Sequence, residues 1–373
     1  MDGSLYRMTE TQQPAPALTA TGGLLSIDLG AIARNWHHLQ RLAPESEIAA
    51  VVKADAYGLG AVPVATRLQS EGCRSFFVAH LCEAQALRAH LALTTRLIVL
   101  HGPVAGAEAE FAEANITPVL NTPHQVAAYT NLARSLGRKL PAILQLDSGM
   151  TRFGLDAADL PALLPLLDAI DLQLVMSHLA CADTPDHPAN AMQLANFTRM
   201  RALFPGIKAS LAASSGIFHG RPMQLDLVRP GAALYGLAPI AGRPNPLEPS
   251  IRLEATVMQL RHVPSGTPLG YGHTATTTRP SRLATIAIGY ADGFRRALSN
   301  QGCVWHGETA LPILGRVSMD SIIADATNTD LTEGDLVELI GPHRTPDDVA
   351  RDSDTIGYEI LTGLGTRFAR RYI

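Results

Sequence analysis

Cysteine is scarce in this chain, and the few cysteines lie far apart. The 373 residues include only Cys73, Cys82, Cys181 and Cys303, and no two of them have the CxxC spacing that is typical of a zinc site. Four thiols are also too few to stabilise a chain of this length by disulfide cross-links. We therefore expect no metal site, and a reducing, cytoplasmic compartment.

Long apolar runs and blocks of like charge are also lacking. The apolar stretch at residues 172–176 is interrupted at Ser177, well short of the roughly 20 residues that cross a bilayer. The chain has 30 Lys and Arg against 34 Asp and Glu, a formal charge of -4, with no basic cluster. These patterns predict neither a membrane nor a nucleic-acid partner, and they favour a small-molecule substrate. Residues 1–22, without a basic segment followed by an apolar one, predict a flexible N-terminal tail.

Apolar residues, by contrast, are abundant. They make up 46% of the chain, whereas charged residues make up 17% against a usual share of about 25%. Such a composition predicts a large core, and the length exceeds that of one ordinary domain. We therefore expect two domains.

Residues 46–236 alternate short β-rich apolar runs with helical patterns, which is typical of parallel strands joined by helical crossovers. Eight such units predict an α/β fold of the TIM (β/α)8 barrel type. A doubly wound open sheet is the alternative, but no GxGxxG follows the first strand. The predicted strands are 48–52, 76–79, 97–100, 116–120, 142–146, 172–176, 208–211 and 225–228.

The pattern changes after Tyr235. Residues 239–249 include four prolines and predict a linker, and the alternating segments beyond it predict a mostly antiparallel β domain. We expect the tail at 1–22, the barrel at 23–240 and the β domain at 250–373. The strand-like segment 24–28, which precedes a helical pattern at 29–41, is a candidate to pair with the β domain. The β-domain strands are predicted at 253–263, 283–288, 311–317, 321–324 and 336–340.

Lys53 directly follows the first predicted barrel strand. In this fold reactive groups lie where strands end, and an ammonium at an apolar barrel mouth has a lowered pKa. A lysine that forms a Schiff base is one interpretation, and a solvated lysine at a strand end is the other. Other polar groups follow later strands and are expected at the same mouth, namely Asp147, Arg152, His178, Ser214 and Arg229.

Small residues follow the seventh and eighth strands, where this fold often builds a phosphate site from backbone N–H groups. They are Ser214, Ser215 and Gly216, and then Gly231 and Ala232. A simple turn is the alternative interpretation. A lysine opposite a phosphate site suggests pyridoxal 5'-phosphate (PLP) as cofactor.

At this point the chain resembles a known family. The segment AVVKADAYGLG at 50–60 resembles the lysine segment of the alanine racemase family of PLP enzymes, and further matches run in order from about residue 23 to 370. They are DSGMTRFG at 147–154, SHLA at 177–180, VRPG at 228–231, YG at 235–236, GYG at 270–272, IGYADG at 288–293, GRVSMD at 315–320 and TIGYE at 355–359.

The resemblance implies a homodimer in which the barrel of one chain meets the β domain of the other. It further implies that Lys53 holds PLP, with His178 beside the cofactor and Arg229 facing the pyridine nitrogen. Substrate contacts are implied for Arg152, Met319 and Tyr290. The implied phosphate ligands are Tyr57, Ser214, Gly231, Ala232 and Tyr358. Taken as single residues, His178 could equally be structural, and Tyr358 could be a half-buried aromatic.

Racemisation of alanine needs two bases, because a proton leaves one face of Cα and returns on the other. The resemblance assigns Lys53 to the D-specific face and Tyr271, from the partner chain, to the L-specific face. A tyrosine base needs a nearby positive charge, for which His178, Arg229 and Arg152 are the candidates. D-alanine for peptidoglycan precursors is the expected product.

Three alternatives stay open. A related PLP decarboxylase would carry an acidic residue where this chain has Arg229. A non-catalytic PLP-binding protein would lack Tyr271 and the second domain. A broader racemase acting on serine or basic amino acids fits the same motifs, although Tyr290 and Met319 resemble the narrow entrance of alanine-selective enzymes.

The chain also departs from the family pattern. Asp55 stands where Asn is usual, Leu59 where His is usual, and Ser318 where many members have Cys. Gln145 stands where many members have a carbamylated lysine that orients the arginine matching Arg152. Glutamine carries no charge, so we expect Arg152 to be held by the Gln145 amide, by a small anion such as chloride, or by its other neighbours.

Overall fold

The computed structural model describes residues 17–373, which divide into two compact units. One, here the barrel unit, consists of Ile27–Ile251, Arg344–Gly363 and Tyr372–Ile373. The other, here the β unit, consists of residues 17–26 with Arg252–His343 and Leu364–Arg371. Most of the tail predicted at 1–22 lies outside the described residues, and Leu18–Ala20 form the short helix η1.

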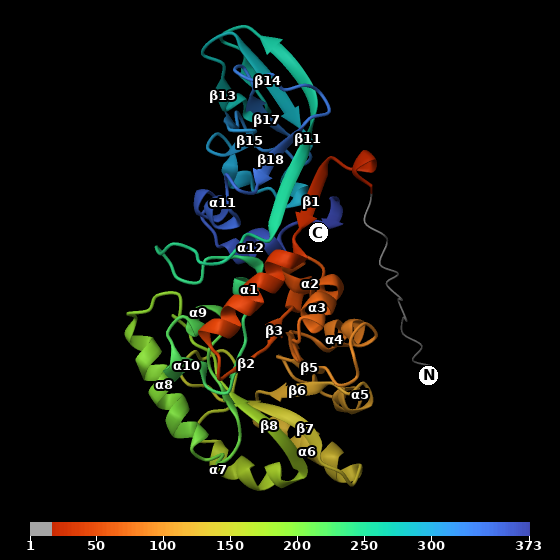
Figure 1. The fold of residues 1–373 in the computed structure, drawn as a ribbon, viewed down its shortest axis with the longest axis vertical. Coiled ribbons are helices and arrows are strands. Elements are labelled where there is room, and N and C mark those ends of the chain that lie inside the picture. Colours follow the sequence, from red (N-terminus) through yellow and green to blue (C-terminus); the bar gives the residue numbers. More distant parts are fainter. Residues whose placement is uncertain (1–16) are drawn as a thin grey trace. The chain divides into compact units, whose positions relative to one another are not determined.

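Parallel strands form the core of the barrel unit (Figure 1), and hydrogen bonds between the first and last of them close the strands into a ring. The first strand is interrupted at Ala49 into β2 (Glu47–Ile48), which pairs with β10 (Leu227–Val228), and β3 (Ala50–Val51), which pairs with β4 (Ser75–Val78). Closure is completed by backbone hydrogen bonds from Ala49 N to the Val228 carbonyl (3.0 Å) and from Val51 N to the Pro230 carbonyl (2.9 Å). All eight predicted barrel strands are confirmed: β2 (Glu47–Ile48) with β3 (Ala50–Val51), β4 (Ser75–Val78), β5 (Arg96–Val99), β6 (Thr117–Leu120), β7 (Leu140–Gln145), β8 (Ile170–Met176), β9 (Ala209–Ser210) and β10 (Leu227–Val228).

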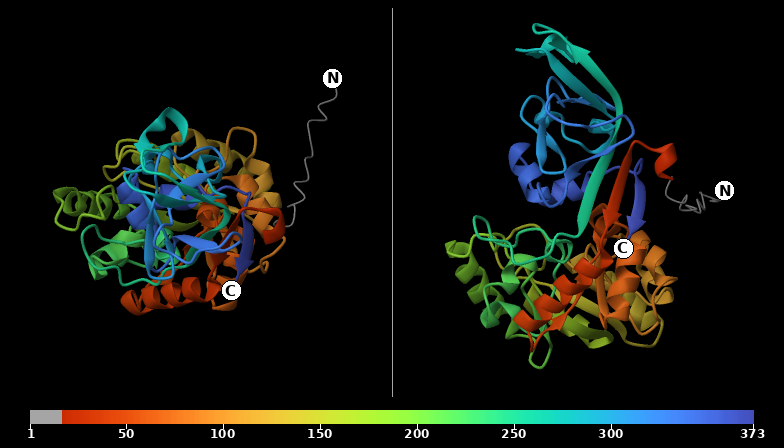
Figure 2. Two further views of the ribbon diagram at one scale, coloured as in Figure 1. Left: turned by 90° about the horizontal axis from the view of Figure 1, so that it is seen from above. Right: turned by 45° about the horizontal axis from the view of Figure 1, so that its top comes forward.

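Helices follow the strands and lie around the outside of the ring (Figures 1 and 2). Their starts are set by capping: Asp28 accepts from Ala31 N at 2.7 Å, and Thr122 accepts from Gln125 N at 3.1 Å. Apolar strand side chains such as Phe76 and Phe77 are fully buried. The helices are α1 (Leu29–Leu42), α3 (Ala61–Ser70), α4 (Leu81–Arg88), α5 (Glu108–Glu113), α6 (Pro123–Ser135), α7 (Leu160–Leu163) with η2 (Leu164–Ala169), α8 (Pro188–Arg201), α9 (Ser214–Ile217), α10 (Arg221–Gln224) and η3 (Ala232–Tyr235).

The proline-rich segment predicted as a linker is bound to α1. The Asn35 amide donates to the carbonyls of Leu234 and Glu248 and accepts from Glu248 N, at distances of 3.1, 2.9 and 2.8 Å. These bonds fix the chain where it leaves the barrel.

The β unit is a twisted, mostly antiparallel sheet in which β1 lies between β11 and β19. Its long strand β11 pairs with β18 along its first half and with β14 along its second half. The strands are β1 (Gly23–Ile27), β11 (Ile251–Val263), β12 (Pro268–Leu269), β13 (Ala275–Thr276), β14 (Ser281–Ile286), β15 (Cys303–His306), β16 (Thr309–Pro312), β17 (Ile322–Asp325), β18 (Leu336–Ile340) and β19 (Ala369–Tyr372).

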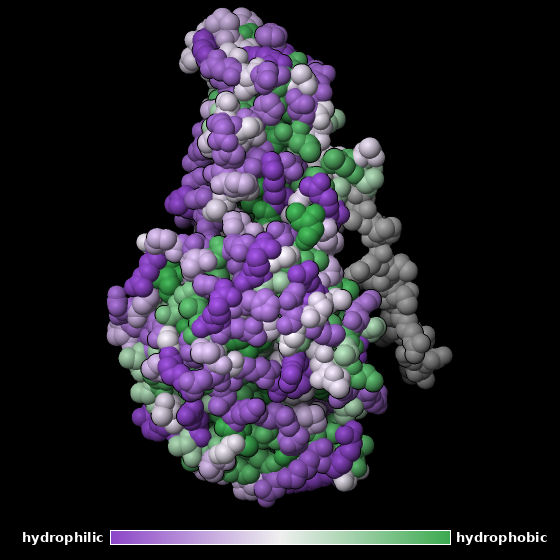
Figure 3. Space-filling view, viewed as in Figure 1, coloured by the Kyte–Doolittle hydropathy of each residue, from purple (hydrophilic) through white to green (hydrophobic). Residues whose placement is uncertain are grey.

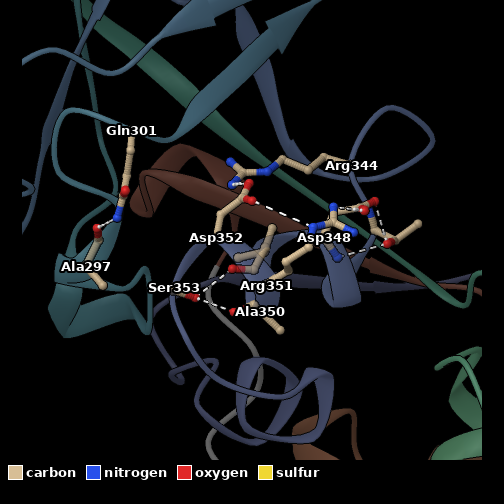
Figure 4. A network of polar contacts seen from close by, with 10 residues as sticks. Ala297, Gln301, Arg344, Asp348, Ala350, Arg351, Asp352 and Ser353 are labelled. Atoms are coloured by element: carbon tan, nitrogen blue, oxygen red, sulfur yellow. Dashed lines mark hydrogen bonds and ion pairs between the residues drawn. The ribbon is translucent and has the colours of Figure 1, made fainter. Parts of the chain in front are cut away.

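Two helices late in the chain belong to the barrel unit, whereas the sequence predicts one β domain over 250–373. They are α11 (Pro346–Asp352) and α12 (Gly357–Thr362). The Asp347 carboxylate accepts from Ala238 N at 2.8 Å, which ties α11 to the end of the barrel. Ion pairs of Arg344 with Asp352 and of Arg351 with Asp348 stabilise α11 itself (Figure 4).

Among residues 17–373, no helix is long and apolar enough to cross a bilayer. The same residues contain no group of His, Cys, Asp or Glu arranged to hold a metal ion. Hydrophilic and apolar residues are interspersed over the face drawn in Figure 3.

Candidate active site at the barrel mouth

Lys53 begins a turn of unusual handedness. In α2 (Lys53–Gly58) the backbone of Ala54 through Tyr57 has φ between 53° and 58°, which is left-handed. This conformation costs roughly 1–2 kcal/mol for each residue other than glycine. The turn therefore needs strong support from its surroundings, as strained segments at functional sites usually do.

Two carboxylates provide that support. Glu83 accepts from Ala54 N at 2.6 Å with one oxygen, and from the N–H groups of Ala79 and His80 at 2.8 and 2.9 Å with the other. Asp55, which replaces the usual Asn, accepts from Ala61 N at 2.6 Å and so anchors the start of α3. The turn that begins at Lys53 is thus tied to the starts of α3 and α4.

The environment of Lys53 favours its neutral amine. Burial is the main cause of its lowered pKa, the charge of Arg152 lowers it further, and Glu83 opposes the shift. The lowered pKa agrees with the expectation for an ammonium at an apolar strand end.

A cluster of N–H and hydroxyl groups lies where β9 and β10 end. Ser214 Oγ accepts from Gly231 N at 3.0 Å and from Ala233 N at 3.1 Å. The buried Ala232 N–H, at the start of η3, has no acceptor among residues 17–373. A free, buried N–H of this kind is suited to an anion.

Tyr57 approaches this cluster closely because residue 231 is glycine. A Cβ at Gly231 would lie 2.3 Å from the Tyr57 hydroxyl. The Tyr57 ring lies 4.8 Å from that of Tyr235 and 6.0 Å from that of Tyr358. Burial raises the pKa of Tyr57 and of Tyr358, so both hydroxyls keep their protons and can donate to an anion.

Arg229 and His178 adjoin each other inside the mouth. Arg229 is buried, donates to the Ser210 hydroxyl and to the Ser177 carbonyl (2.6 Å), and lies 3.5 Å from His178 Nδ1. Burial lowers the pKa of Arg229 to about 10, so the guanidinium keeps its charge at neutral pH.

Burial, reinforced by the charges of Arg229 and Arg152, lowers the pKa of His178 to about 3. The lowered pKa favours a neutral imidazole and so does not support His178 as one of the positive groups expected beside a tyrosine base. Arg229 and Arg152 remain the candidates for that positive charge.

Arg152 is exposed, and no acceptor within residues 17–373 bonds its guanidinium. The Gln145 amide, which the sequence suggests as one partner, donates instead to the Phe153 carbonyl at 3.4 Å.

Three further predicted residues lie in the β unit. Tyr271 begins η4 (Tyr271–His273), Tyr290 begins η5 (Tyr290–Asp292), and Met319 lies in a turn beside η5. Their exposed fractions are 71%, 43% and 53%, so all three side chains are accessible within their own chain. Tyr290 N donates to the Ser318 carbonyl and Ala291 N to the Met319 carbonyl, both at 3.0 Å, and this brings Tyr290 and Met319 together.

Comparison with known proteins identifies this arrangement. A model of the alanine racemase N-terminal domain matches residues 27–239, and a model of the C-terminal domain matches residues 250–372. The chain belongs to the alanine racemase family.

Close relatives cover nearly the whole chain. A catabolic alanine racemase from Agrobacterium fabrum is 51% identical over 363 residues, which are 96% of this chain and 94% of the relative. An alanine racemase from Brucella canis is 49% identical over 374 residues, 95% of this chain and 94% of the relative. The crystal structure of the Bartonella henselae alanine racemase, which has covalently bound pyridoxal phosphate, is 44% identical with a TM-score of 0.91, covering 96% of this chain and all of that one.

Two residues that support the site were not predicted from the sequence or from its resemblance to the alanine racemases. Glu83 supports the Lys53 turn, and Arg367 joins the two loops that carry Tyr290 and Met319 by donating to Asp292 (2.7 Å) and Asp320 (2.8 Å). A Glu three residues into a helix is a capping signal that could have indicated Glu83. Arg367 lies 47 residues from Asp320, and no local pattern indicates that contact.

Proposed function

We propose that this chain interconverts L-alanine and D-alanine with PLP as its cofactor, as a homodimer with shared active sites. The observation that carries the proposal is the arrangement at the barrel mouth. A lysine with a lowered pKa begins a strained turn beside a cluster of anion donors, in a chain 51% identical to a named alanine racemase.

The residues present fit PLP. The free Ala232 N–H and the protonated Tyr57 and Tyr358 hydroxyls suit a phosphate, together with Ser214 and Gly231. Arg229 would face the pyridine nitrogen and, because it keeps its proton, would leave that nitrogen unprotonated. Bound PLP supplies the electron withdrawal that acidifies the Cα–H of an attached amino acid. Borohydride reduction followed by peptide mapping should find the cofactor on Lys53, and a label on another residue would contradict this assignment.

Two bases would move the proton. The Lys53 amine takes or returns it on the D-specific face of Cα, and the phenol oxygen of the partner subunit's Tyr271 does so on the opposite face. Desolvation lowers the pKa of Lys53 and so favours the neutral amine that acts as a base. Because each base serves one face, the Lys53 amine and the phenol oxygen of the partner subunit's Tyr271 must both lie within reach of the substrate Cα.

Substrate size would be set by Tyr290 and Met319, with Arg152 and the Met319 backbone as polar contacts. The close approach of the two loops supports a narrow site, since a Cβ at Gly289 would lie 2.2 Å from the Met319 carbonyl. Alanine is therefore the proposed substrate, and D-alanine for peptidoglycan precursors remains the proposed use. The cytoplasmic location stays a prediction.

Exchange of the Cα proton in deuterium oxide tests this proposal. The protein is incubated with each L-amino acid in turn, and loss of the Cα proton is followed by NMR. Alanine should exchange fastest and yield both enantiomers. Faster exchange of serine or of a basic amino acid would favour the broader racemase, and no exchange with any amino acid would favour a PLP-binding protein without catalysis.

A further inference from the structure

Arg152 lies on a turn whose first half is fixed by one carboxylate. Asp147 Oδ1 accepts from the N–H groups of Gly149, Met150 and Thr151 at 2.8, 3.0 and 3.1 Å. Thr151 nevertheless has φ of 56°, which is unfavourable for a β-branched residue. The turn is therefore strained next to Arg152, and the guanidinium has no acceptor of its own among residues 17–373.

The second half of the turn is held at Phe153, the neighbour of Arg152. The Phe153 carbonyl accepts from Gln145 Nε2, and the Phe153 ring lies 5.1 Å from the His101 ring at an interplanar angle of 35°. His101 in turn meets His80 edge to face, with ring centroids 4.5 Å apart. Phe153 is 38% exposed, and the contact with His101 is one restraint on its ring.

These rings come from three different strand ends. His80 follows β4, His101 follows β5, and Phe153 follows β7. The ring contacts therefore span the mouth of the barrel from the Lys53 side to the Arg152 turn. Partial burial and the neighbouring His80 lower the pKa of His101, so its ring adds no positive charge beside Lys53 and Arg152 at neutral pH.

We infer that His101 and Gln145 are positioning residues that hold Arg152 at the barrel mouth through Phe153, His101 by contact with the ring and Gln145 by a hydrogen bond to the carbonyl. Neither residue touches the guanidinium. A shift of Phe153 moves the Arg152 backbone directly, because the two residues share a peptide bond. The effect of Arg152 on substrate binding rests on the proposed function. The effect of His101 and Gln145 on the order of the turn does not depend on it.

Hydrogen exchange of the full chain, measured by mass spectrometry, tests the order of the turn. In His101→Ala the amides of residues 149–155 should exchange about five-fold faster, because an aromatic pair contributes roughly 0.5–1.5 kcal/mol. His101→Phe, which keeps a ring, should stay within about two-fold of wild type by the same reasoning. His90→Ala, at an exposed position after α4, is the matched control and should change nothing.

Steady-state kinetics then test the effect on Arg152. His101→Ala and Gln145→Met should each raise the KM for alanine, about five-fold for His101→Ala, with kcat nearly unchanged and with rescue by His101→Phe. Unchanged exchange of residues 149–155 in His101→Ala would overturn the inference, as would failure of His101→Phe to rescue. Marked stimulation of the wild type by bicarbonate would also overturn it, since a carbamate would then be holding Arg152. Absence of racemase activity in the wild type would contradict the proposed function, but it would not affect the hydrogen-exchange result.

Discussion

Burial lowers the pKa of three basic groups at the barrel mouth, but the effect on charge differs from one group to the next. Lys53 has a lowered pKa, Arg229 keeps its proton with a pKa of about 10, and His178 loses its proton with a pKa of about 3. Three basic residues close together would repel one another if all were charged. The neutral imidazole removes one of those charges.

The neutral His178 predicts a pH-dependent stability. Its pKa is about 3 when folded and 6.5 when unfolded, so between these values the unfolded chain binds one proton more. The free energy of unfolding should therefore fall as the pH drops below about 6.5, by up to about 1.4 kcal/mol per pH unit from this residue. Urea unfolding of wild type and His178→Gln at pH 6.5 and pH 5 measures the difference, which should reach about 1.6 kcal/mol.

His124→Gln, at an exposed position, provides the control and should keep the wild-type dependence. An equal loss of stability in His178→Gln and wild type would mean that the imidazole is already charged in the folded protein.

The positions of single functional groups were predictable where they follow a strand. Lys53, Ser214 and Arg229 all come at such points, and the parallel-strand pattern was enough to place them at one mouth. The charge of His178 was not predictable, because it depends on groups that fold over it. The contacts of Gln145 were not predictable either, since a local pattern does not show where an amide points.

At the scale of elements, the left-handed turn after Lys53 depends on Glu83. Glu83→Gln removes one of two acceptor oxygens and places an NH2 group against backbone N–H groups. We expect a loss of about 2 kcal/mol in the free energy of unfolding, together with less cofactor trapped on Lys53 by borohydride. Urea unfolding and peptide mapping measure the two effects.

Glu113→Gln, at the exposed end of α5, is the matched control. If Glu83→Gln behaves like this control in both measurements, the turn does not need the carboxylate.

A second element-scale prediction concerns the loops that carry Tyr290 and Met319. Arg367 joins them through Asp292 and Asp320, and these contacts hold its guanidinium in the charged form. Arg367→Ala should raise the KM for alanine roughly five-fold and improve serine relative to alanine, because the narrow site loosens. Arg367→Lys should be intermediate, since an ammonium cannot reproduce the forked geometry.

Steady-state kinetics with both substrates check this prediction. Arg261→Ala, at an exposed position on β11, serves as control, because the Arg261 side chain donates to Gln259 and not to either loop. A fall in kcat with an unchanged KM would point away from a role in shaping the substrate site.

The order of elements was largely predictable, and their handedness and grouping were not. Hydrophobic periodicity located every barrel strand, but it gave no sign that Ala54 to Tyr57 would be left-handed, since none of these residues is glycine. It also assigned α11 and α12 to the β domain, because the Asp347 contact with Ala238 spans 109 residues.

At the scale of the whole molecule, the proposed mechanism divides the two bases between the two units. Lys53 belongs to the barrel unit and Tyr271 to the β unit. The resemblance assigns the second base to the partner chain. We therefore predict that a separated monomer is inactive.

Hybrid dimers test this central claim most directly. Lys53→Ala and Tyr271→Phe chains, each inactive alone, are mixed in equal amounts, and exchange of subunits is verified by native mass spectrometry. A mixed dimer contains one site with both changes and one intact site, so random pairing should restore roughly a quarter of the wild-type activity. Verified mixed dimers without restored activity would contradict a site that takes Lys53 from one chain and Tyr271 from its partner.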